Sequence, residues 1–462
     1  MQGPLVAWAL LGHLAMTSLS SLNALLLGQG RGDPLLRCAA GQNCSVVLQS
    51  AIDAAAGVGG TGALYIGGTW PVLPIALRSN LILLLASDAT VIAQQGAFHG
   101  GGDHLIDVLG VQNVSIRGAV GGGSRLVMRK SDYTDTKRYV HSEGRHALYI
   151  VESRHIRVSD LEILDPGGDS VYLSGSVGGG PATDVELLRV VSRNAYRNGL
   201  SITGARDVVV RSCSFLNTSG TPPEAGIDIE PNYPLSVIRN ISFFGLQSRW
   251  NRGSGISLAL GKLDCSTLKP PCHHPEDCVC PKSPPLVTIT VAGAQIQGAS
   301  QMGLNASALI QGLDYNIGVF ISASPLNNSS RGWFHFSNVA VNETVQPGLE
   351  FEDKTALSLP TRFANCSWSH VATAKTVRWG GQNVPLLLHQ AGYGAIGGVT
   401  FENCSVSDAA MKRPWLKCDS CGSRGPALGI AGDVTVQNSA GCSTKNVPTD
   451  SLAVNCHRGR GP

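Results

Sequence analysis

Charged side chains are scarce in this chain of 462 residues, where Asp, Glu, Lys and Arg make up 15% of the total, against about 25% in ordinary soluble domains. The formal net charge is only +3. It forms no basic cluster, which argues against a nucleic-acid partner. The repeated part of the chain lacks the periodicity of amphipathic helices, which excludes a helical bundle. Beyond the first residues, no apolar run is long enough to span a membrane.

The chain begins with an apolar run over residues 5–16, followed by small and polar residues up to Ala24. This pattern predicts a secretory signal peptide that is cleaved near Ala24. The first residues carry no Lys or Arg, and a signal anchor is the alternative, although the run is short for a membrane span. We therefore expect a secreted, extracellular protein that is not held in the membrane after cleavage.

Glycine is abundant, with 56 residues, as expected of a chain that makes many tight turns. A short apolar phrase also recurs about every 23–29 residues, which is the spacing of a solenoid. The phrase occupies residues 147–150, 170–173, 199–202, 226–229 and 255–258. Each phrase is usually followed by a turn and a second strand with alternating apolar and polar residues. Such coils bury their apolar face only by stacking, so the sequence predicts an all-β, single-stranded parallel β-helix forming one domain.

Ten of the thirteen cysteines fall in local clusters with an even number of members. The clusters are Cys38 and Cys44; Cys265, Cys272, Cys278 and Cys280; and Cys418, Cys421, Cys442 and Cys456. In an oxidising compartment such clusters predict disulfides. A zinc site over residues 272–280 is the alternative for the middle cluster. The other three lie inside strand phrases, where we expect them to point into the core as small apolar residues. They are Cys213, Cys366 and Cys404.

Ten N-x-[ST] sequons suit a glycosylated, secreted protein. Four of their asparagines stand immediately before predicted strands, namely Asn113, Asn240, Asn365 and Asn403. An asparagine in that position can also stack coil upon coil through its side-chain amide. For these four residues we expect structural stacking rather than glycosylation.

The N-terminal part of the chain predicts a cap for the solenoid. Residues 45–56 have helical apolar spacing, and they are followed by a glycine-rich turn and a strand over residues 63–66. A helix there would cover the open end of the first coil. This string, with the coil pattern up to about residue 260, resembles the pectate-lyase-like and polygalacturonase-like proteins. Residues 167–173, 197–202 and 217–232 also resemble a run in secreted right-handed parallel β-helix repeat proteins. The resemblance implies a right-handed, pectin-lyase-like β-helix that acts on polysaccharides outside the cell.

We therefore expect four segments along the chain. They are a signal peptide at 1–24, an N-terminal segment with the capping helix at 25–62, the β-helix at 63–410 and a Cys-rich C-terminal segment at 411–462.

Asp228 and Glu230 lie two residues apart on a predicted strand, so both should project from its outer face. Aligning the phrases places Tyr149, Tyr172, Ser201, Asp228 and Ser257 in one ladder on consecutive coils. The turns before the strands add Asp169 and several polar residues. We predict Asp228, Glu230 and Asp169 as catalytic residues. The predicted substrate-binding residues are His146, Tyr172, Arg197, Asn198, Arg252 and Asn232.

Paired carboxylates of this kind suit a glycoside hydrolase, in which one protonates the leaving oxygen and the other activates water or attacks carbon. Such an enzyme requires no cofactor. A polysaccharide lyase or uronate epimerase is an alternative, with Ca²⁺ held by Asp228 and Glu230. Arg197 and Arg252 would suit an acidic sugar. A non-catalytic glycan-binding or cell-wall scaffold is the third possibility. The chain has no Gly-His-Gly, Arg-Ile-Lys or Asp-Pro-His-Asp motif, so the reaction stays open. We expect a monomer.

Overall fold

The β-helix lies within one compact unit of the chain, Arg37–Pro462. The computed structural model describes residues 35–57, 60–176, 179–263, 279–283, 285–298, 315–322, 331–352, 359–374, 377, 381–389, 396–408, 413–419, 427–438, 443–445, 447 and 452–458. The predicted signal peptide and most of the predicted zinc loop lie outside these residues. Among the described helices, none has both the length and the apolar character needed to cross a bilayer.

Within the described residues the strands form a 12-stranded and a 23-stranded sheet. The 12-stranded sheet consists of β3 (Ile75–Ala76), β6 (Ile106–Leu109), β9 (Leu148–Val151), β12 (Val171–Ser174), β15 (Leu200–Ile202), β18 (Ile227–Ile229), β21 (Ile256–Ala259), β24 (Val319–Ser322), β27 (Leu349–Glu352), β30 (Leu386–His389), β32 (Leu416–Asp419) and β34 (Thr444–Lys445).

The 23-stranded sheet contains two columns of strands. The first column consists of β1 (Gly62–Ile66), β4 (Leu81–Leu85), β7 (Gln112–Arg117), β10 (Arg154–Ser159), β13 (Ala182–Leu188), β16 (Ala205–Arg211), β19 (Ile238–Phe244), β22 (Leu286–Ala292), β25 (Arg331–Ser337), β28 (Thr361–Ala364), β31 (Ile396–Asp408), β33 (Ala427–Asn438) and β35 (Leu452–Arg458). The second consists of β2 (Thr69–Val72), β5 (Thr90–Ala93), β8 (Arg125–Val127), β11 (Glu162–Leu164), β14 (Val191–Arg193), β17 (Ser214–Leu216), β20 (Gln247–Arg249), β23 (Gln295–Gln297), β26 (Ala340–Asn342) and β29 (Ser367–Ser369).

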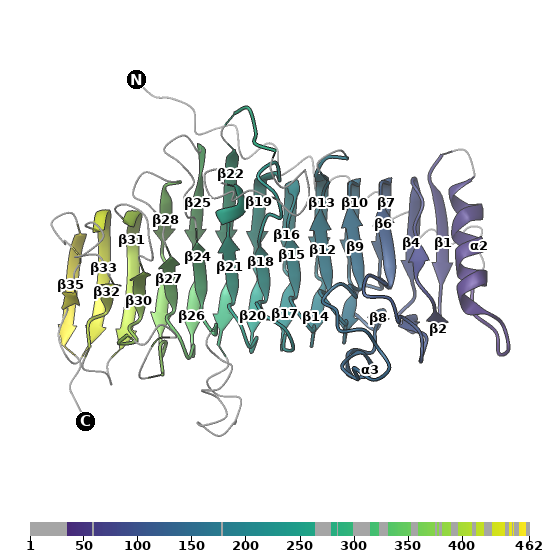
Figure 1. The fold of residues 1–462 in the computed structure, drawn as a ribbon, viewed down its shortest axis with the longest axis horizontal. Coiled ribbons are helices and arrows are strands. Elements are labelled where there is room, and N and C mark those ends of the chain that lie inside the picture. The colour runs from purple at the N-terminus through teal and green to yellow at the C-terminus, as the bar shows by residue number, and fades with distance from the viewer. Residues whose placement is uncertain are drawn as a thin grey trace. The chain divides into compact units, whose positions relative to one another are not determined.

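In the middle of the unit each coil contributes one strand to every column, and each strand pairs in parallel with the equivalent strand of the next coil, as β15 does with β18. The columns therefore run side by side through the unit (Figure 1). Inward-facing residues alternate along the strands and are buried, as Ile227 and Ile229 are on β18. The prediction of a parallel β-helix is confirmed.

The stacking also continues through β32, β33 and β35, so coils extend into the segment at 411–462 that the sequence pattern separated from the β-helix.

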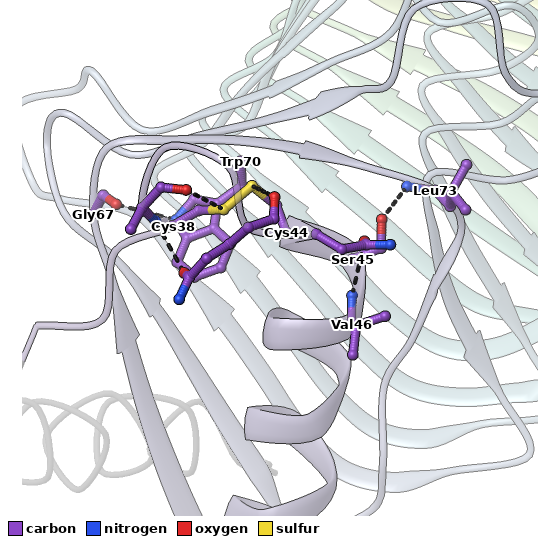
Figure 2. The surroundings of a disulfide bond; sticks show 10 residues. Cys38, Cys44, Ser45, Val46, Gly67, Trp70 and Leu73 are labelled. Carbon is purple, nitrogen blue, oxygen red and sulfur yellow. Dashed lines mark hydrogen bonds between the residues drawn. A yellow bond between two sulfur atoms is a disulfide. The ribbon is translucent and has the colours of Figure 1, made fainter.

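A helix, α2 (Cys44–Ala56), packs beside the first coil, as the capping prediction required. The Asn43 side chain accepts a hydrogen bond from the Val46 backbone N–H and caps the helix, while Leu48 and Ile52 are buried. A disulfide joins Cys38 to Cys44, the first residue of the helix (Figure 2). The predicted pairing of this local cysteine cluster is confirmed. Two shorter helical segments are α3 (Lys130–Tyr133) and η1 (Gly261–Leu263).

Side chains stack along the coils as the repeat pattern predicted. The amide of Asn113 donates to Asn80 Oδ1 at 3.1 Å, and the amide of Asn403 donates to Asn365 Oδ1 at 2.8 Å. The structural stacking of these asparagines is confirmed, and glycosylation of any sequon stays a prediction. The cysteines expected in the core, Cys213, Cys366 and Cys404, are buried and carry free thiols.

Candidate active site

The turn before each strand of the 12-stranded sheet supplies one edge of the site. Six consecutive strands, β6, β9, β12, β15, β18 and β21, pair in register at their first residues. Two positions before them stand His104, His146, Asp169, Asn198, Ala225 and Ser254. These six residues therefore stack along one edge of the sheet. The predicted ladder that joins Tyr149, Tyr172, Ser201, Asp228 and Ser257 through neighbouring strands is confirmed by the same register.

Glycine occupies the position immediately before β15, β18 and β21, namely Gly199, Gly226 and Gly255. At these positions the backbone lies close to core side chains and leaves no room for a Cβ atom. A Cβ atom added at Gly226 would lie 2.1 Å from Ser248 Oγ and 2.7 Å from Asn251 Nδ2. Both of those residues are buried. A larger residue at Gly226 would push the start of β18, and Asp228 with it, away from the neighbouring strands.

Four aromatic rings lie in nearly parallel planes at the N-terminal side of the site. The ring centroids of His146 and Tyr172 are 4.6 Å apart, those of His104 and Tyr149 are 3.9 Å apart, and those of Tyr149 and Tyr172 are 5.5 Å apart. Burial lowers the pKa of His104 to about 4. Burial, His104 and Arg197 together hold the pKa of His146 well below its usual range. Both imidazoles are therefore uncharged at neutral pH, and the four rings form a neutral surface.

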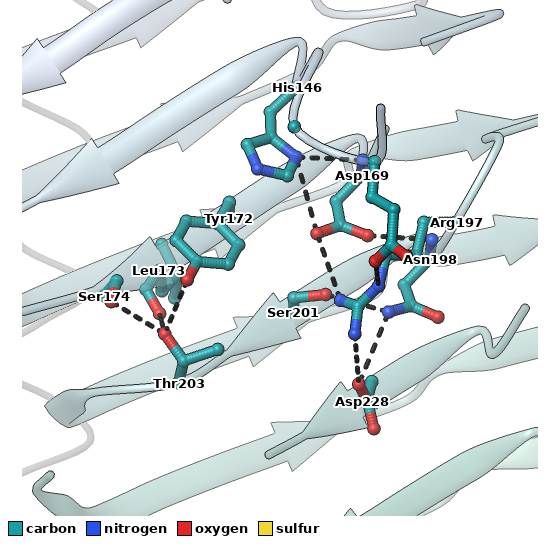
Figure 3. A network of polar contacts seen from close by, with 12 residues as sticks. His146, Asp169, Tyr172, Leu173, Ser174, Arg197, Asn198, Ser201, Thr203 and Asp228 are labelled. Atoms are coloured by element: carbon teal, nitrogen blue, oxygen red, sulfur yellow. Dashed lines mark hydrogen bonds and ion pairs between the residues drawn. The ribbon is translucent and has the colours of Figure 1, made fainter. Parts of the chain in front are cut away.

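Arg197 is largely buried and contacts four carboxylates. Figure 3 shows its guanidinium between Asp169 and Asp228. Its Nε is 3.0 Å from Glu143 Oε2 and its Nη1 is 3.6 Å from Asp169 Oδ2. Its Nη2 is 3.4 Å from Glu230 Oε2 and 3.9 Å from Asp228 Oδ2. These contacts raise the pKa of Arg197 despite its burial, so the guanidinium stays charged. The single cation balances only part of the negative charge around it.

Asp169 is fully buried, and burial is the main reason that its pKa rises to about 6. Its Oδ1 accepts the Asn198 backbone N–H at 2.9 Å. Its Oδ2 has no hydrogen-bond partner and lies 3.4 Å from His146 Nδ1. That nitrogen accepts the Asp169 backbone N–H at 3.0 Å, so the neutral ring carries its proton on Nε2. The contact between Asp169 and His146 is therefore no ion pair, and Asp169 keeps its proton more readily than an exposed aspartate.

Asp228 is also almost fully buried, with 1% of its surface exposed. Burial first, and then the charge of Glu230, raise its pKa to about 7. The Asn198 amide donates to Asp228 Oδ2 at 3.4 Å and to Ser201 Oγ at 3.0 Å. Asn198 Oδ1 accepts the backbone N–H of Ala225 at 2.8 Å. Together with its backbone bond to Asp169, Asn198 thus ties three neighbouring coils together beneath the site.

A cavity of about 410 Å³ lies above these groups. It is lined by Gly102, His104, Glu143, Gly144, His146, Tyr149, Asp169, Tyr172, Arg197, Thr203, Glu230 and Asn232. The Glu230 side chain is 36% exposed. Asn232 donates its amide to the Tyr172 hydroxyl at 3.1 Å. The cavity therefore brings a neutral aromatic surface and a cluster of carboxylates together on neighbouring coils.

The structure gathers most of the residues selected from the sequence. His146, Asp169, Tyr172, Arg197, Glu230 and Asn232 line the cavity. Asp228 and Asn198 lie buried next to them and are not among the residues that line the cavity. Arg252 does not line the cavity, and its Nη1 lies 3.5 Å from Glu224.

Two charged or titratable side chains of the cavity, His104 and Glu143, were missed in the sequence. His104 occupies the same turn position as His146 one coil earlier, so extending the repeat alignment by one phrase would have found it. Glu143 lies in a long connection between β8 and β9, where the sequence has no repeat signal.

The arrangement of the acids does not fit a bound Ca²⁺ at Asp228 and Glu230. The Arg197 guanidinium lies within 3.9 Å of both carboxylates and fills the place that a cation would take. In the part of the chain that the structure describes, no group of three or more His, Cys, Asp or Glu side chains is arranged to hold a metal ion.

No protein-family model matches the sequence, and no characterised protein matches it in sequence. Solved structures do match its fold. The A-module of the mannuronan C-5 epimerase AlgE6 from Azotobacter vinelandii has a TM-score of 0.52 and 11% identity, covering 90% of this chain and 92% of its own. The catalytic unit of the GH87 α-1,3-glucanase from Streptomyces thermodiastaticus has a TM-score of 0.54 and 12% identity, covering 94% of this chain and 70% of its own. This chain therefore shares the right-handed parallel β-helix fold of these structures.

Proposed function

We propose that this protein is an extracellular enzyme that hydrolyses glycosidic bonds in a polysaccharide. The observation that carries the proposal is a single cavity in which an aromatic surface adjoins a buried acid of raised pKa, Asp169, and a partly exposed carboxylate, Glu230. Aromatic faces bind the apolar faces of sugar rings, and glycoside hydrolysis needs a proton donor and a base or nucleophile. The epimerase and the glucanase of similar fold act, by their names, on mannuronan and α-1,3-glucan, which supports a polysaccharide substrate.

In this proposal Asp169 is the general acid. It gives its proton to the leaving glycosidic oxygen as the bond between that oxygen and the anomeric carbon breaks. The carboxylate that results is stabilised by Arg197 Nη1, 3.6 Å away, and by the Asn198 backbone N–H. Arg197 contacts both Asp169 and Glu143, and the Glu143 side chain is 51% exposed. The Glu143 side chain can therefore move aside at small cost when a sugar enters.

Glu230 is the general base. It accepts a proton from a water molecule whose oxygen attacks the anomeric carbon. Glu230 and Asp169 each contact a nitrogen of the same planar guanidinium, so their nearest oxygens lie at most about 9 Å apart. That limit is compatible with the separation of about 6.5–9.5 Å in inverting enzymes and also with the about 5–5.5 Å of retaining enzymes. Asp228 takes no direct part, and its burial beneath Arg197 helps to hold the guanidinium between the two reacting acids.

The test is to compare the wild-type protein with Asp169→Asn and Glu230→Gln on a panel of neutral and acidic polysaccharides, measuring new reducing ends. Each variant should lose about 10²–10⁴-fold in kcat/KM, the range for removing a general acid or base. Glu162→Gln is the matched control because Glu162 pairs with Arg125 on the other sheet. This control should cleave like the wild type. Unchanged cleavage in both site variants would refute the assignment. A wild-type protein that binds glycans without cleaving any would indicate a scaffold instead.

A further inference from the structure

The charges around the cavity are predominantly negative. Three carboxylates line it, those of Glu143, Asp169 and Glu230, and Asp228 lies directly beneath. Among the lining residues Arg197 is the one permanently charged cation. The two lining histidines are neutral because burial lowers their pKa values. Even with both buried aspartates protonated, two carboxylates face one guanidinium, so the cavity repels anions.

The Arg197 guanidinium is already surrounded by carboxylates of the protein. Its Nε, Nη1 and Nη2 each lie within 3.6 Å of a carboxylate oxygen that belongs to the protein. An acidic sugar could reach Arg197 only by displacing one of these carboxylates. The more exposed partners, Glu143 and Glu230, would stay beside the cavity and would still repel the charge of the sugar. A polysaccharide carboxylate or sulfate therefore gains little from this arginine.

The second arginine that would have suited an acidic sugar is also placed elsewhere. Arg252 lies outside the cavity lining, and its Nη1 is 3.5 Å from Glu224 Oε1. Glu224 in turn accepts the Gly220 backbone N–H at 2.6 Å. Arg252, in the turn before β21, therefore pairs with Glu224 in the turn before β18 and is part of the structure of these turns.

The remaining polar groups of the cavity are uncharged hydroxyls and amides. Thr203 Oγ1 and the Asn232 amide both lie 3.1 Å from the Tyr172 hydroxyl. Beside them are the four parallel rings of His104, His146, Tyr149 and Tyr172. Such groups match the two features of a neutral sugar, its hydroxyls and its apolar ring faces.

We infer that the substrate is a neutral polysaccharide, and that the cavity discriminates against polyuronates and sulfated glycans. The inference rests on the proposed function, because it names the substrate class of the same cavity. Neutral sugar rings lie on the aromatic surface, and the carboxylates around Arg197 repel an anionic chain.

The experiment compares polymers that differ only in charge. Polygalacturonate and its carboxyl-reduced form have the same linkage, and other polyuronates are paired with their reduced forms in the same way. Neutral glucans, mannans and xylans complete the panel. Binding and cleavage by the wild-type protein are measured at about 0.01 M and about 0.15 M salt, where the Debye length falls from about 30 to about 8 Å. We expect at least one neutral polymer to bind at least about tenfold more tightly than the acidic polymers at low salt.

The change in binding between low and high salt gives a second test of the inference. Screening should leave binding of the neutral polymer unchanged and should improve the weak binding of the acidic polymers, because repulsion is what opposes them. Glu143→Gln, which removes one of the repelling charges, should reduce the difference in affinity between neutral and acidic polymers. Tighter binding of an acidic polymer than of its reduced form, weakened by salt, would overturn the inference.

The outcomes separate the two proposals. Cleavage of acidic polymers alone would leave the hydrolase proposal standing and refute the neutral substrate. Selective binding of a neutral polymer without cleavage would support the substrate class and refute the hydrolase. Neither binding nor cleavage across the panel would refute both.

Discussion

The burial of Asp228 predicts a pH dependence of stability that Asp228→Asn should remove. The ordinary pKa of an aspartate, 3.8, is raised to about 7 in the folded protein by burial and by Glu230. Between these values the folded state binds a proton that the unfolded state has lost. Stability contributed through this group is therefore greatest at low pH and falls as the pH rises through that window.

The size of the effect follows from the two pKa values. One pKa unit corresponds to about 1.4 kcal/mol. With 3.8 for the unfolded and about 7 for the folded protein, linkage gives a penalty of about 2 kcal/mol near pH 5 and about 4 kcal/mol near pH 8. The wild-type protein should thus lose about 2–3 kcal/mol of unfolding free energy over this interval because of Asp228 alone. Asparagine keeps the shape and can still accept from Asn198, so the variant loses the penalty without leaving a void.

Urea unfolding near pH 5 and near pH 8, for the wild type and Asp228→Asn, measures this difference. The variant should be more stable than the wild type near pH 8, and the gap should shrink near pH 5. Glu162→Gln is the control, because the Glu162 side chain is 30% exposed and surface pairs contribute about 0–1 kcal/mol. An equal decline with pH in wild type and Asp228→Asn would refute the assignment of a raised pKa to Asp228.

Three further predictions concern the proposed general acid, Asp169, and two residues in the turns before the strands, Asn198 and Gly226. Activity should fall as the pH rises above about 6, where burial has placed the pKa of Asp169, because the proton donor is lost. The Asp169→Asn variant should not show this fall in activity above about pH 6. A fall that persists in the variant would mean that another group causes it. Asn198→Ala should destabilise the protein by about 1–3 kcal/mol in urea unfolding, because the buried Ala225 N–H loses its acceptor; a loss below about 0.5 kcal/mol would contradict this. Gly226→Ala should lower the free energy of unfolding by about 1–3 kcal/mol, because the added Cβ would clash with Ser248. A melting temperature equal to that of the wild type would show that the turn before β18 can accommodate the added atom.

The period of the repeats was sufficient to predict the coils and their register. Aligning the phrases placed Tyr172 beside Ser201 and Ser201 beside Asp228, and the strands pair in that way. This works because a solenoid has one geometric rule, the stacking of equivalent positions on consecutive coils. The same rule also predicts the position of His104, but the alignment of the phrases began one coil after it.

Burial within the site could not be predicted in the same way. Alternation placed Asp228 and Glu230 on one outer face, yet Asp228 is 1% exposed while the Glu230 side chain is 36% exposed. The difference arises because Arg197, from the preceding coil, reaches over Asp228. Contacts of long side chains depend on rotamers and on all neighbours together, which a one-dimensional pattern does not contain.

The connection that carries Glu143 was also beyond sequence reasoning. The path from β8 to β9 is not part of the repeat, so no equivalent position in another coil indicates where Glu143 lies. Its contact with Arg197 at 3.0 Å completes the set of carboxylates. The sequence alone therefore left the arginine available for an acidic sugar, whereas the structure shows it bound by the protein itself.

The mass of the products released from a neutral polysaccharide tests the central claim most directly. Hydrolysis adds one water to every bond cleaved, so oligosaccharides made by the wild-type protein should have the masses of complete sugars with new reducing ends. Asp169→Asn and Glu230→Gln should release almost none. Products that lack the added water would identify elimination instead, and intact polymer after prolonged incubation with the wild-type protein would contradict the hydrolase account.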